Sequence, residues 1–309
     1  MPSPEYARVL AYLAERYGTR SASALTDAEY VAQSRAANSG YADVDGVPPP
    51  LAPDTTITPV SAGGVPGEWV RASGSDPARR LLWIHGGGWI ACAPADYRNI
   101  TEHLSRALGA VVLAIDYRLA PEHPFPAGLD DCLAAYRWLG DNGPATALWV
   151  AGDSAGGNLT LALLLRLKTT GETMPDAAAT IGAATDFTGS GTSMRTRADV
   201  DVMIAPEALA RLGRLYVQDR TPLTDPLVSP LFGDLARLPP IRMHVGDREV
   251  LLDDTLRFAA KARAAGVHVE HKVWPDMIHV FEGFCHVLPE ARQSLDEIAA
   301  FLGRHTGKI

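Results

Sequence analysis

Residues 147–160 read Ala-Leu-Trp-Val-Ala-Gly-Asp-Ser-Ala-Gly-Gly-Asn-Leu-Thr. The five residues before Gly152 are apolar and predict a buried strand, and the leucine-rich stretch that follows the glycines favours a helix. A strand, a G-x-S-x-G motif and a helix in this order predict a sharp turn that exposes Ser154 as a nucleophile. Gly152 and Gly156 suit the turn because Cβ atoms would collide in so tight a corner. The alternative is a glycine-rich turn whose serine only caps the helix.

A second glycine loop, His85-Gly86-Gly87-Gly88-Trp89, follows an expected buried strand at 81–84. Successive glycines let the backbone approach a substrate and turn N–H groups towards it. We assign the N–H groups of Gly87 and Gly88 to an oxyanion hole, together with that of Ala155 after the nucleophile. The alternatives are a flexible turn, a dinucleotide loop or a phosphate loop. The last two need G-x-G-x-x-G or G-x-x-x-x-G-K, which this loop lacks.

A serine nucleophile needs a base, and in this order of elements the base follows the serine. Of the six later histidines, His279 lies in a loop just past an expected strand at 267–274, where it can reach the turn at Ser154. We therefore predict that His279 is the general base. The others are expected to be a core residue (His244), residues on opposite faces of one strand (His268 and His271) and solvated residues beside the last helix (His286 and His305).

The third member of such a site is a carboxylate that orients the histidine. Residues 245–254 read Val-Gly-Asp-Arg-Glu-Val-Leu-Leu-Asp-Asp and supply four candidates. Asp253 and Asp254 fit the N-terminal cap of a following helix. Asp247 and Glu249 are two residues apart and would share one face of a continued strand. Spacing alone leaves both of them open.

From residue 80 onward, short apolar runs alternate with helical patterns, which predicts a mostly parallel, doubly wound sheet. Strands are expected at 54–60, 67–72, 81–84, 111–115, 147–151, 178–184, 241–245 and 267–274. Helices are expected at 4–17, 26–38, 99–108, 129–139, 206–217 and 289–302, with a further one before Gly266. Gly18 suits the end of the first helix, and Thr26 with Glu29 forms a capping box for the second.

The alternation of strands and helices is interrupted at 186–235, which is polar and rich in proline apart from one helix. We predict that this insertion packs with the N-terminal helices into a helical cap over the carboxyl ends of the strands, where such sheets bind ligands. The expected organisation is therefore N-terminal helices of the cap at 1–50, the first part of the catalytic domain at 51–185, the cap insertion at 186–235 and the second part of the catalytic domain at 236–309.

The formal net charge of −8 argues against nucleic acid or an anionic membrane as partner. We see no apolar run long enough to span a bilayer and no signal peptide, so no stable membrane insertion is expected. Three widely spaced cysteines, Cys92, Cys132 and Cys285, fit a reduced, cytoplasmic protein and form no metal-binding pattern. The sequence implies no cofactor, and it leaves a homodimer open.

The chain resembles the bacterial hormone-sensitive-lipase-like esterases of the α/β-hydrolase superfamily. The matching motifs are residues 85–89, residues 152–157 and the stretch at 116–127, which reads Asp-Tyr-Arg-Leu-Ala-Pro-Glu-His-Pro-Phe-Pro-Ala. The resemblance extends from about residue 80 to the C-terminus. It implies an α/β-hydrolase fold with a helical cap, hydrolysis of short- to medium-chain carboxylic esters, and no metal or cofactor.

The resemblance also chooses between the two open carboxylates. Placing the end of the family's D-x-L-x-D-[DE] pattern on residues 251–254 puts Glu249 on the acid position, where the family more often has aspartate. The interval to His279, 279 − 249 = 30 residues, is the usual one in the family. The implied triad is Ser154, His279 and Glu249, and Asp247 is the alternative acid.

Three other functions remain open from the sequence: a lactone, amide or carbamate hydrolase with the same triad, a non-catalytic ligand-binding relative, and a lipase that acts at oil–water interfaces. Asp153 is expected to support the serine turn rather than to react, and Glu122 is either a second supporting residue or a solvated charge of its loop. Four aromatic residues are candidates either for the pocket walls or for the core: Trp89, Phe187, Tyr216 and Phe281.

Overall fold

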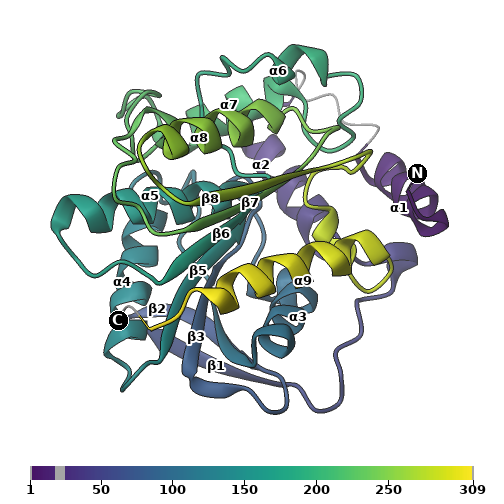
Figure 1. Ribbon diagram of the computed structural model, residues 1–309. Helices are drawn as coiled ribbons and strands as arrows, with labels where there is room; N and C mark the ends of the chain where they lie inside the picture. Colours follow the sequence, from purple (N-terminus) through teal and green to yellow (C-terminus); the bar gives the residue numbers. More distant parts are fainter. Residues whose placement is uncertain (1, 18–24, 308–309) are drawn as a thin grey trace.

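The computed structural model describes residues 2–17 and 25–307, so the helix stop expected at Gly18 lies outside the described residues. Within them, one eight-stranded sheet has the order β1-β2-β4-β3-β5-β6-β7-β8 (Figure 1). The strands are β1 (Thr56–Ala62), β2 (Val65–Arg71), β3 (Asp76–Ile84), β4 (Ala110–Ile115), β5 (Ala147–Asp153), β6 (Ala177–Ile181), β7 (Ile241–Gly246) and β8 (Val269–Trp274).

The sheet is mostly parallel, which confirms the fold class predicted from the sequence. Strand β2 runs antiparallel to β1 and β4, whereas all other neighbours are parallel. Every residue of β4 and β5 is buried, as expected for parallel strands covered on both faces. The chain order reverses between β3 and β5, and ligands bind at such a switch point, outside the carboxyl ends of the strands.

Helices cover both faces of the sheet. Helices α3 and α9 share a hydrophobic core with one face, and α4, α5 and α8 pack on the other. Helix α5, which follows β5, is apolar nearly all round and is buried at twelve positions. The helices are α1 (Pro4–Tyr17), α2 (Asp27–Asn38), α3 (Arg98–Leu108), α4 (Ala127–Asp141), α5 (Ser154–Thr170), α6 (Ser193–Thr196), α7 (Pro206–Val217), α8 (Leu252–Ala264) and α9 (Pro289–Arg304).

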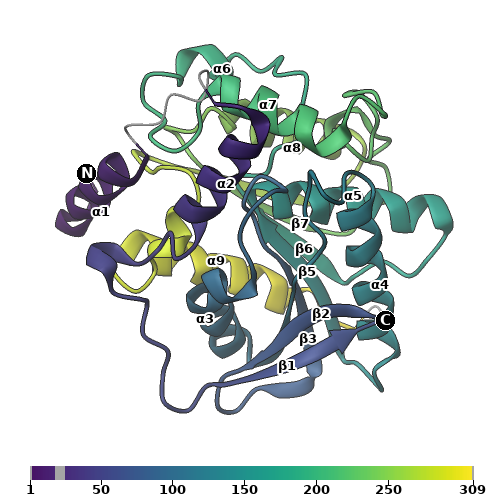
Figure 2. The same ribbon diagram turned by 180° about the vertical axis from the view of Figure 1, so that it is seen from behind.

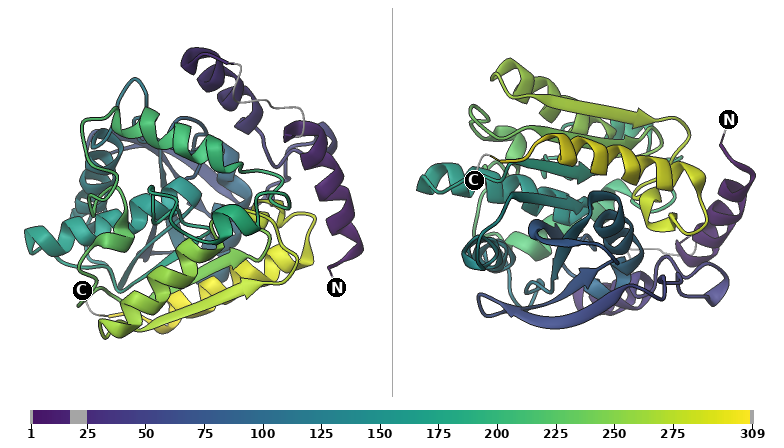
Figure 3. Two further views of the ribbon diagram at one scale, coloured as in Figure 1. Left: turned by 90° about the horizontal axis from the view of Figure 1, so that it is seen from above. Right: turned by 60° about the horizontal axis from the view of Figure 1, so that its bottom comes forward.

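Helices α2, α6 and α7 lie above the carboxyl ends of the central strands (Figures 1 and 2). Figure 3 (left) shows α7 from above, with α1 and α2 along one border of the molecule. The predicted capping box of Thr26 and Glu29 is present at the start of α2. Arg211 of α7 donates from Nε to Asp27 Oδ1 at 2.8 Å and lies 4.6 Å from the ring centre of Tyr30. These contacts fix α2 against α7.

The predictions for the end of β6 and for the start of α8 were wrong. The strand expected at 178–184 ends at Ile181, because Gly182 adopts a φ of +52° and leaves the extended conformation. Asp253 and Asp254 do not cap α8. Instead, Asp254 accepts hydrogen bonds from backbone N–H groups beyond β6, at Thr185 and Asp186, and therefore ties α8 to that loop.

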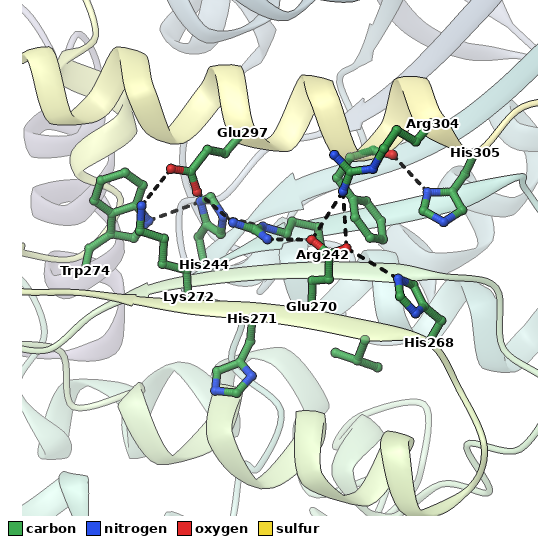
Figure 4. A network of polar contacts seen from close by, with 12 residues as sticks. Arg242, His244, His268, Glu270, His271, Lys272, Trp274, Glu297, Arg304 and His305 are labelled. Carbon is green, nitrogen blue, oxygen red and sulfur yellow. Dashed lines mark hydrogen bonds and ion pairs between the residues drawn. The ribbon is translucent and has the colours of Figure 1, made fainter.

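An ionic network joins β7, β8 and α9 (Figure 4). Arg242 of β7 donates to Glu270 and Glu297 at 2.8 and 2.7 Å, and Lys272 pairs with Glu297 at 2.7 Å. The side chain of Arg242 also donates to His244 Nε2 at 2.6 Å, so His244 is a hydrogen-bonded core residue as predicted. The network fastens the outer strands of the sheet to their covering helix.

Four other histidines that follow Ser154 in the sequence lie away from the candidate site. His268 and His271 lie on opposite faces of the sheet, as predicted (Figure 4). His286 and His305 are half-buried rather than solvated, and His305 contacts the Phe301 carbonyl at 2.9 Å.

Among the described residues, no helix is long and apolar enough to cross a membrane.

Candidate active site

The turn between β5 and α5 has the conformation predicted from the G-x-S-x-G motif. Ser154 adopts a φ of +50°, which is rare for a residue other than glycine. A Cβ on Gly152 would lie 2.4 Å from the carbonyl oxygen of Ile84, and a Cβ on Gly156 would lie 1.9 Å from the same atom. Both glycines are therefore needed because the turn packs directly against the end of β3.

The glycine loop after β3 also takes up conformations that favour glycine. Gly87 has a φ of +100° and Gly88 a φ of +63°. A Cβ on Gly87 would lie 2.2 Å from the carbonyl oxygen of Ala91, whose own N–H donates back to the Gly87 carbonyl at 3.0 Å. Across residues 2–17 and 25–307, the N–H groups of Gly87 and Gly88 have no hydrogen-bond acceptor. The N–H of Ala155 lies in the first turn of α5, where no intrahelical acceptor exists.

Asp153 connects the glycine loop to the serine turn. Its side chain is 1% exposed, accepts a hydrogen bond from Gly86 N–H at 2.8 Å and accepts another from Tyr97 Oη at 3.1 Å. Burial raises the pKa of Asp153 to about 7, although the nearby His279 opposes that shift. This carboxyl points at the loop backbone and not at the histidine ring, consistent with a supporting role.

Glu122 acts at a greater distance from the serine. It pairs with both terminal nitrogens of Arg35 on α2, at 2.9 and 2.7 Å. Arg35 also donates to the carbonyl oxygen of Ile90, directly after the glycine loop, at 2.8 Å. Glu122 and Arg35 therefore anchor α2 on the loop.

The structure brings Ser154, His279 and Glu249 into one hydrogen-bonded series. His279 Nε2 lies 2.9 Å from Ser154 Oγ, and His279 Nδ1 lies 2.6 Å from Glu249 Oε2. The other oxygen of Glu249 accepts from Gly246 N–H at 2.5 Å. Asp247, the alternative acid, makes no hydrogen bond to the ring, and its Oδ1 is buried without a partner among the described residues. A hydroxyl, an imidazole and a carboxylate are thus within hydrogen-bond reach of one another, in the order that nucleophilic catalysis requires.

Two further glycines let the loops that carry this series approach closely. A Cβ on Gly182 would lie 2.7 Å from Glu249 Oε2 and 2.8 Å from His279 Nδ1. A Cβ on Gly246 would lie 2.2 Å from the carbonyl oxygen of Met277. Neither glycine was predicted as a site residue, because a glycine at the end of an apolar strand does not reveal what packs above it.

Buried acidic groups control the charge of the histidine. Burial lowers the pKa of His279, but the charge and hydrogen bond of Glu249, with further contributions from Asp201 and Asp153, outweigh burial and raise the pKa above its ordinary value of 6.5. Burial raises the pKa of Glu249, against the opposing effect of His279. Glu282, three residues beyond the histidine, is also buried, and this burial raises its pKa to about 8.

Asp201 was not predicted from the sequence, and it links the segment before α7 to the loop of Glu249. Its Oδ1 accepts from the N–H groups of Met203 and Ile204 at 2.9 and 3.0 Å, and its Oδ2 accepts from Val250 N–H at 2.9 Å. Burial raises the pKa of Asp201, while these backbone donors and the nearby His279 oppose the shift. No motif marks Asp201, because its role depends on a contact across 49 residues of chain.

We expect Asp201→Asn to move the acid limb of the kcat/KM–pH profile to lower pH. The histidine must be neutral to accept a proton, so kcat/KM rises as pH passes upward through the pKa of His279. Removing one of the negative charges that raise this pKa lowers it and makes the neutral form available at lower pH. The profile is measured from pH 5 to 9 with a fixed ester.

Asp199→Asn, two residues away on the same segment, is the control for this measurement, and its limb should match that of the wild type. A merely structural loss of activity lowers kcat/KM equally at every pH. It therefore leaves the pH at which kcat/KM rises unchanged. An unchanged limb in Asp201→Asn would contradict the electrostatic role.

Above Ser154 lies a cavity of about 110 Å³. Its walls come from the serine turn, the glycine loop, α2 and the segment from 203 to 212. Of the four aromatic candidates from the sequence, Trp89 lines the cavity, whereas Phe187 and Tyr216 pack behind Trp89 with ring centres 4.7 and 5.1 Å away. Phe281 packs on Trp274. The last three are therefore core residues.

The comparisons with known proteins agree with this geometry. Residues 81–283 match the α/β-hydrolase fold family. An acetyl-hydrolase of Streptomyces hygroscopicus is 39% identical over 250 residues, which cover 81% of this chain and 83% of the relative. An esterase of Acinetobacter venetianus is 38% identical over 254 residues, covering 82% of this chain and 83% of the relative.

A comparison with solved structures also places the chain among esterases. The crystal structure of an esterase from the bacterial hormone-sensitive lipase family superposes with a TM-score of 0.89 at 36% identity and covers 99% of both chains. The fold and the serine-centred site thus define an α/β-hydrolase. The chain belongs to the bacterial hormone-sensitive-lipase-like esterases, and its activity is the hydrolysis of carboxylic esters.

Proposed function

We propose that the chain hydrolyses short- to medium-chain carboxylic esters through an acyl-enzyme formed on Ser154, with His279 as the base and Glu249 as the orienting acid. The observation that carries the proposal is the hydrogen-bonded series from Ser154 Oγ through both ring nitrogens of His279 to Glu249 Oε2. This is the order of groups that acyl transfer by a serine requires.

In the first half of the reaction, Ser154 Oγ attacks the acyl carbon and its proton passes to His279 Nε2. The carbonyl electron pair moves onto the oxygen, and the N–H groups of Gly87, Gly88 and Ala155 stabilise the resulting oxyanion. Loss of one such donor typically costs about 3 kcal/mol in the transition state. The intermediate then expels the alcohol, which takes the proton from His279.

In the second half, a water molecule gives a proton to His279 and attacks the acyl carbon. The new intermediate releases the carboxylic acid, and Ser154 Oγ recovers its proton from the ring. Glu249 stabilises the imidazolium in both halves without taking its proton. No redox step or group transfer to a carrier is involved.

The small cavity supports the preference for short chains. Its volume is about 110 Å³, and an engineered protein cavity of about 150 Å³ binds one benzene molecule. Long acyl chains would have to leave the cavity or displace its walls. The name acetyl-hydrolase, given to a relative 39% identical to this chain, also favours a small acyl group.

We further propose that residues 1–50 and 186–235 form a cap on a catalytic domain made of 51–185 and 236–309. The contacts of Arg211 with Asp27 and Tyr30 support a joint unit of α2 and α7. A homodimer, which the sequence leaves open, stays a prediction that light scattering can test.

The experiment that tests the function is a panel of p-nitrophenyl acetate, butanoate, hexanoate and dodecanoate. We expect kcat/KM to fall at least about tenfold from butanoate to dodecanoate, since forcing extra methylenes into a packed space typically costs about 1–3 kcal/mol. The panel is measured beside Ser154→Ala, which corrects for spontaneous hydrolysis.

Phenyl butyrate, an ε-lactone and an anilide, assayed side by side, separate the ester function from the alternatives with the same triad. Faster turnover of the lactone or the anilide would reassign the substrate class, and no turnover at all would favour a ligand-binding relative. An activity that jumps on addition of emulsified long-chain triglyceride would identify a lipase.

A further inference from the structure

The cavity above Ser154 has walls of two different chemical kinds. The segment from 203 to 212 presents aliphatic side chains, among them Ile204, Leu209 and Leu212. Helix α2 presents polar side chains instead, with Ser34 and Asn38 one helical turn apart. An ester held at Ser154 therefore meets hydrocarbon on one set of elements and hydrogen-bonding groups on another.

The side chains of Ser34 and Asn38 differ in whether they already have hydrogen-bond partners in the protein. The side chain of Asn38 accepts from Tyr17 Oη at 3.1 Å and donates to the carbonyl oxygen of Ser34 at 2.8 Å. The hydroxyl of Ser34 has no hydrogen-bond partner anywhere in the described part of the chain, although Ser34 is only 8% exposed. Ser34 Oγ is not one of the fully buried side-chain atoms that lack a partner, so a small molecule can reach it, and Ser34 lines the cavity. This hydroxyl therefore has capacity left to hydrogen-bond a bound molecule.

The position of Ser34 is fixed from several sides. Arg35, the next residue, is held by Glu122 and by the carbonyl oxygens of Ile90 and Ala120. At its first turn, α2 is tied to α7 through Asp27. A hydroxyl on a helix anchored in this way is preorganised, so a bound molecule does not have to pay for ordering it.

We propose that Ser34 is a specificity-determining residue that hydrogen-bonds a second oxygen of the substrate, so that the preferred substrates are small esters bearing a hydroxyl or a second carbonyl a few bonds from the scissile ester. The proposal rests on the ester hydrolysis proposed above and names its substrate class. A serine hydroxyl can both donate and accept, so either kind of oxygen can pair with it. The aliphatic wall then takes the hydrocarbon part of the same molecule.

The test uses pairs of esters that differ only by a hydroxyl in place of a methyl group. 2-Hydroxyethyl acetate against propyl acetate probes the alcohol side, and ethyl 3-hydroxypropanoate against ethyl butanoate probes the acyl side. The quantity compared is the ratio of kcat/KM within each pair, measured in the wild type and in Ser34→Ala. Differences in intrinsic reactivity within a pair cancel between the two proteins.

We expect the ratio of one pair to fall about 3- to 10-fold in Ser34→Ala, the loss typical of one neutral hydrogen bond, while the ester of that pair without the hydroxyl keeps its kcat/KM. Gln33→Ala, an exposed neighbour on α2, is the matched control and should keep the wild-type ratios. Ser34→Cys, which retains the size but only a weak donor, should lie between the two and serves if Ser34→Ala does not fold.

Unchanged ratios for both pairs, in a variant that still hydrolyses propyl acetate and ethyl butanoate, would overturn the role of Ser34 and leave the ester function intact. A fall of the same size in Gln33→Ala would overturn it as well. Failure of the wild type to hydrolyse any of the four esters would instead overturn the proposed function, and the substrate class with it.

Discussion

Replacing Ser154 with alanine should lower kcat for every ester by about 10⁶-fold, the loss seen when a triad nucleophile is removed. The reason is chemical: without the hydroxyl, the acyl carbon has no nucleophile at the position that His279 Nε2 serves from 2.9 Å. The measurement is turnover of p-nitrophenyl butanoate, with thermal unfolding recorded in parallel. The midpoint of unfolding should stay close to that of the wild type, because only one oxygen is removed.

Ser61→Ala, an exposed serine on the outer strand β1, is the matched control and should keep full activity. An organophosphate should label the wild type once per chain, at Ser154, and should not label Ser154→Ala. Stoichiometric labelling at any other residue would contradict the assignment of the nucleophile, and so would a kcat in Ser154→Ala within tenfold of the wild type.

A second large loss of activity is expected when the carboxylate of Glu249 is replaced. Glu249→Gln should lower kcat by about 10⁴-fold, the loss typical when a triad carboxylate becomes an amide of the same shape. The amide carries no charge to stabilise the imidazolium, and its NH₂ group favours the wrong tautomer of the ring, whose Nδ1 now faces Glu249 Oε2 at 2.6 Å. The measurement is kcat for p-nitrophenyl butanoate at the pH optimum.

Asp247→Asn is the matched comparison, since it neutralises a carboxylate two residues away that makes no contact with the ring. We expect less than a tenfold change in kcat for this variant. If Asp247→Asn lost more activity than Glu249→Gln, the role of the acid would move to Asp247 in spite of the hydrogen bond that Glu249 makes.

The sequence predicted the serine turn and the glycine loop best, because both are marked by short motifs of glycines. At Gly152 and Gly156 the backbone of Ile84 leaves no space for a Cβ, and at Gly87 the φ of +100° excludes other residues. Constraints of this kind leave glycines in the sequence as their mark, even where the atom that excludes a Cβ belongs to another strand, as Ile84 does.

The prediction was weaker wherever two distant segments meet. Asp253 and Asp254 had the spacing of helix caps, but backbone N–H groups across the fold, such as that of Thr185, take up their carboxylates. Phe187 and Tyr216 were candidates either for the pocket walls or for the core, and the folded chain stacks them behind Trp89 in the core. A helical or aromatic pattern does not say which partner competes for a side chain once the chain is folded.

By itself, then, the sequence determined the α/β class, the sharp turn at Ser154 and the choice of His279 among six histidines, since each depends on the order of elements along the chain. Spacing along the chain left Glu249 and Asp247 both open, and the tertiary structure places at the ring the residue that the family resemblance implies, Glu249. Only the tertiary structure brought Asp201 beside the loop of Glu249 and made Ser34 part of the cavity wall. The physical reason is that a hydrogen bond depends on a distance of about 3 Å between two atoms. Residues 30 to 125 positions apart, such as Glu249 and Ser154 from His279, reach that distance only after the loops that carry them have packed.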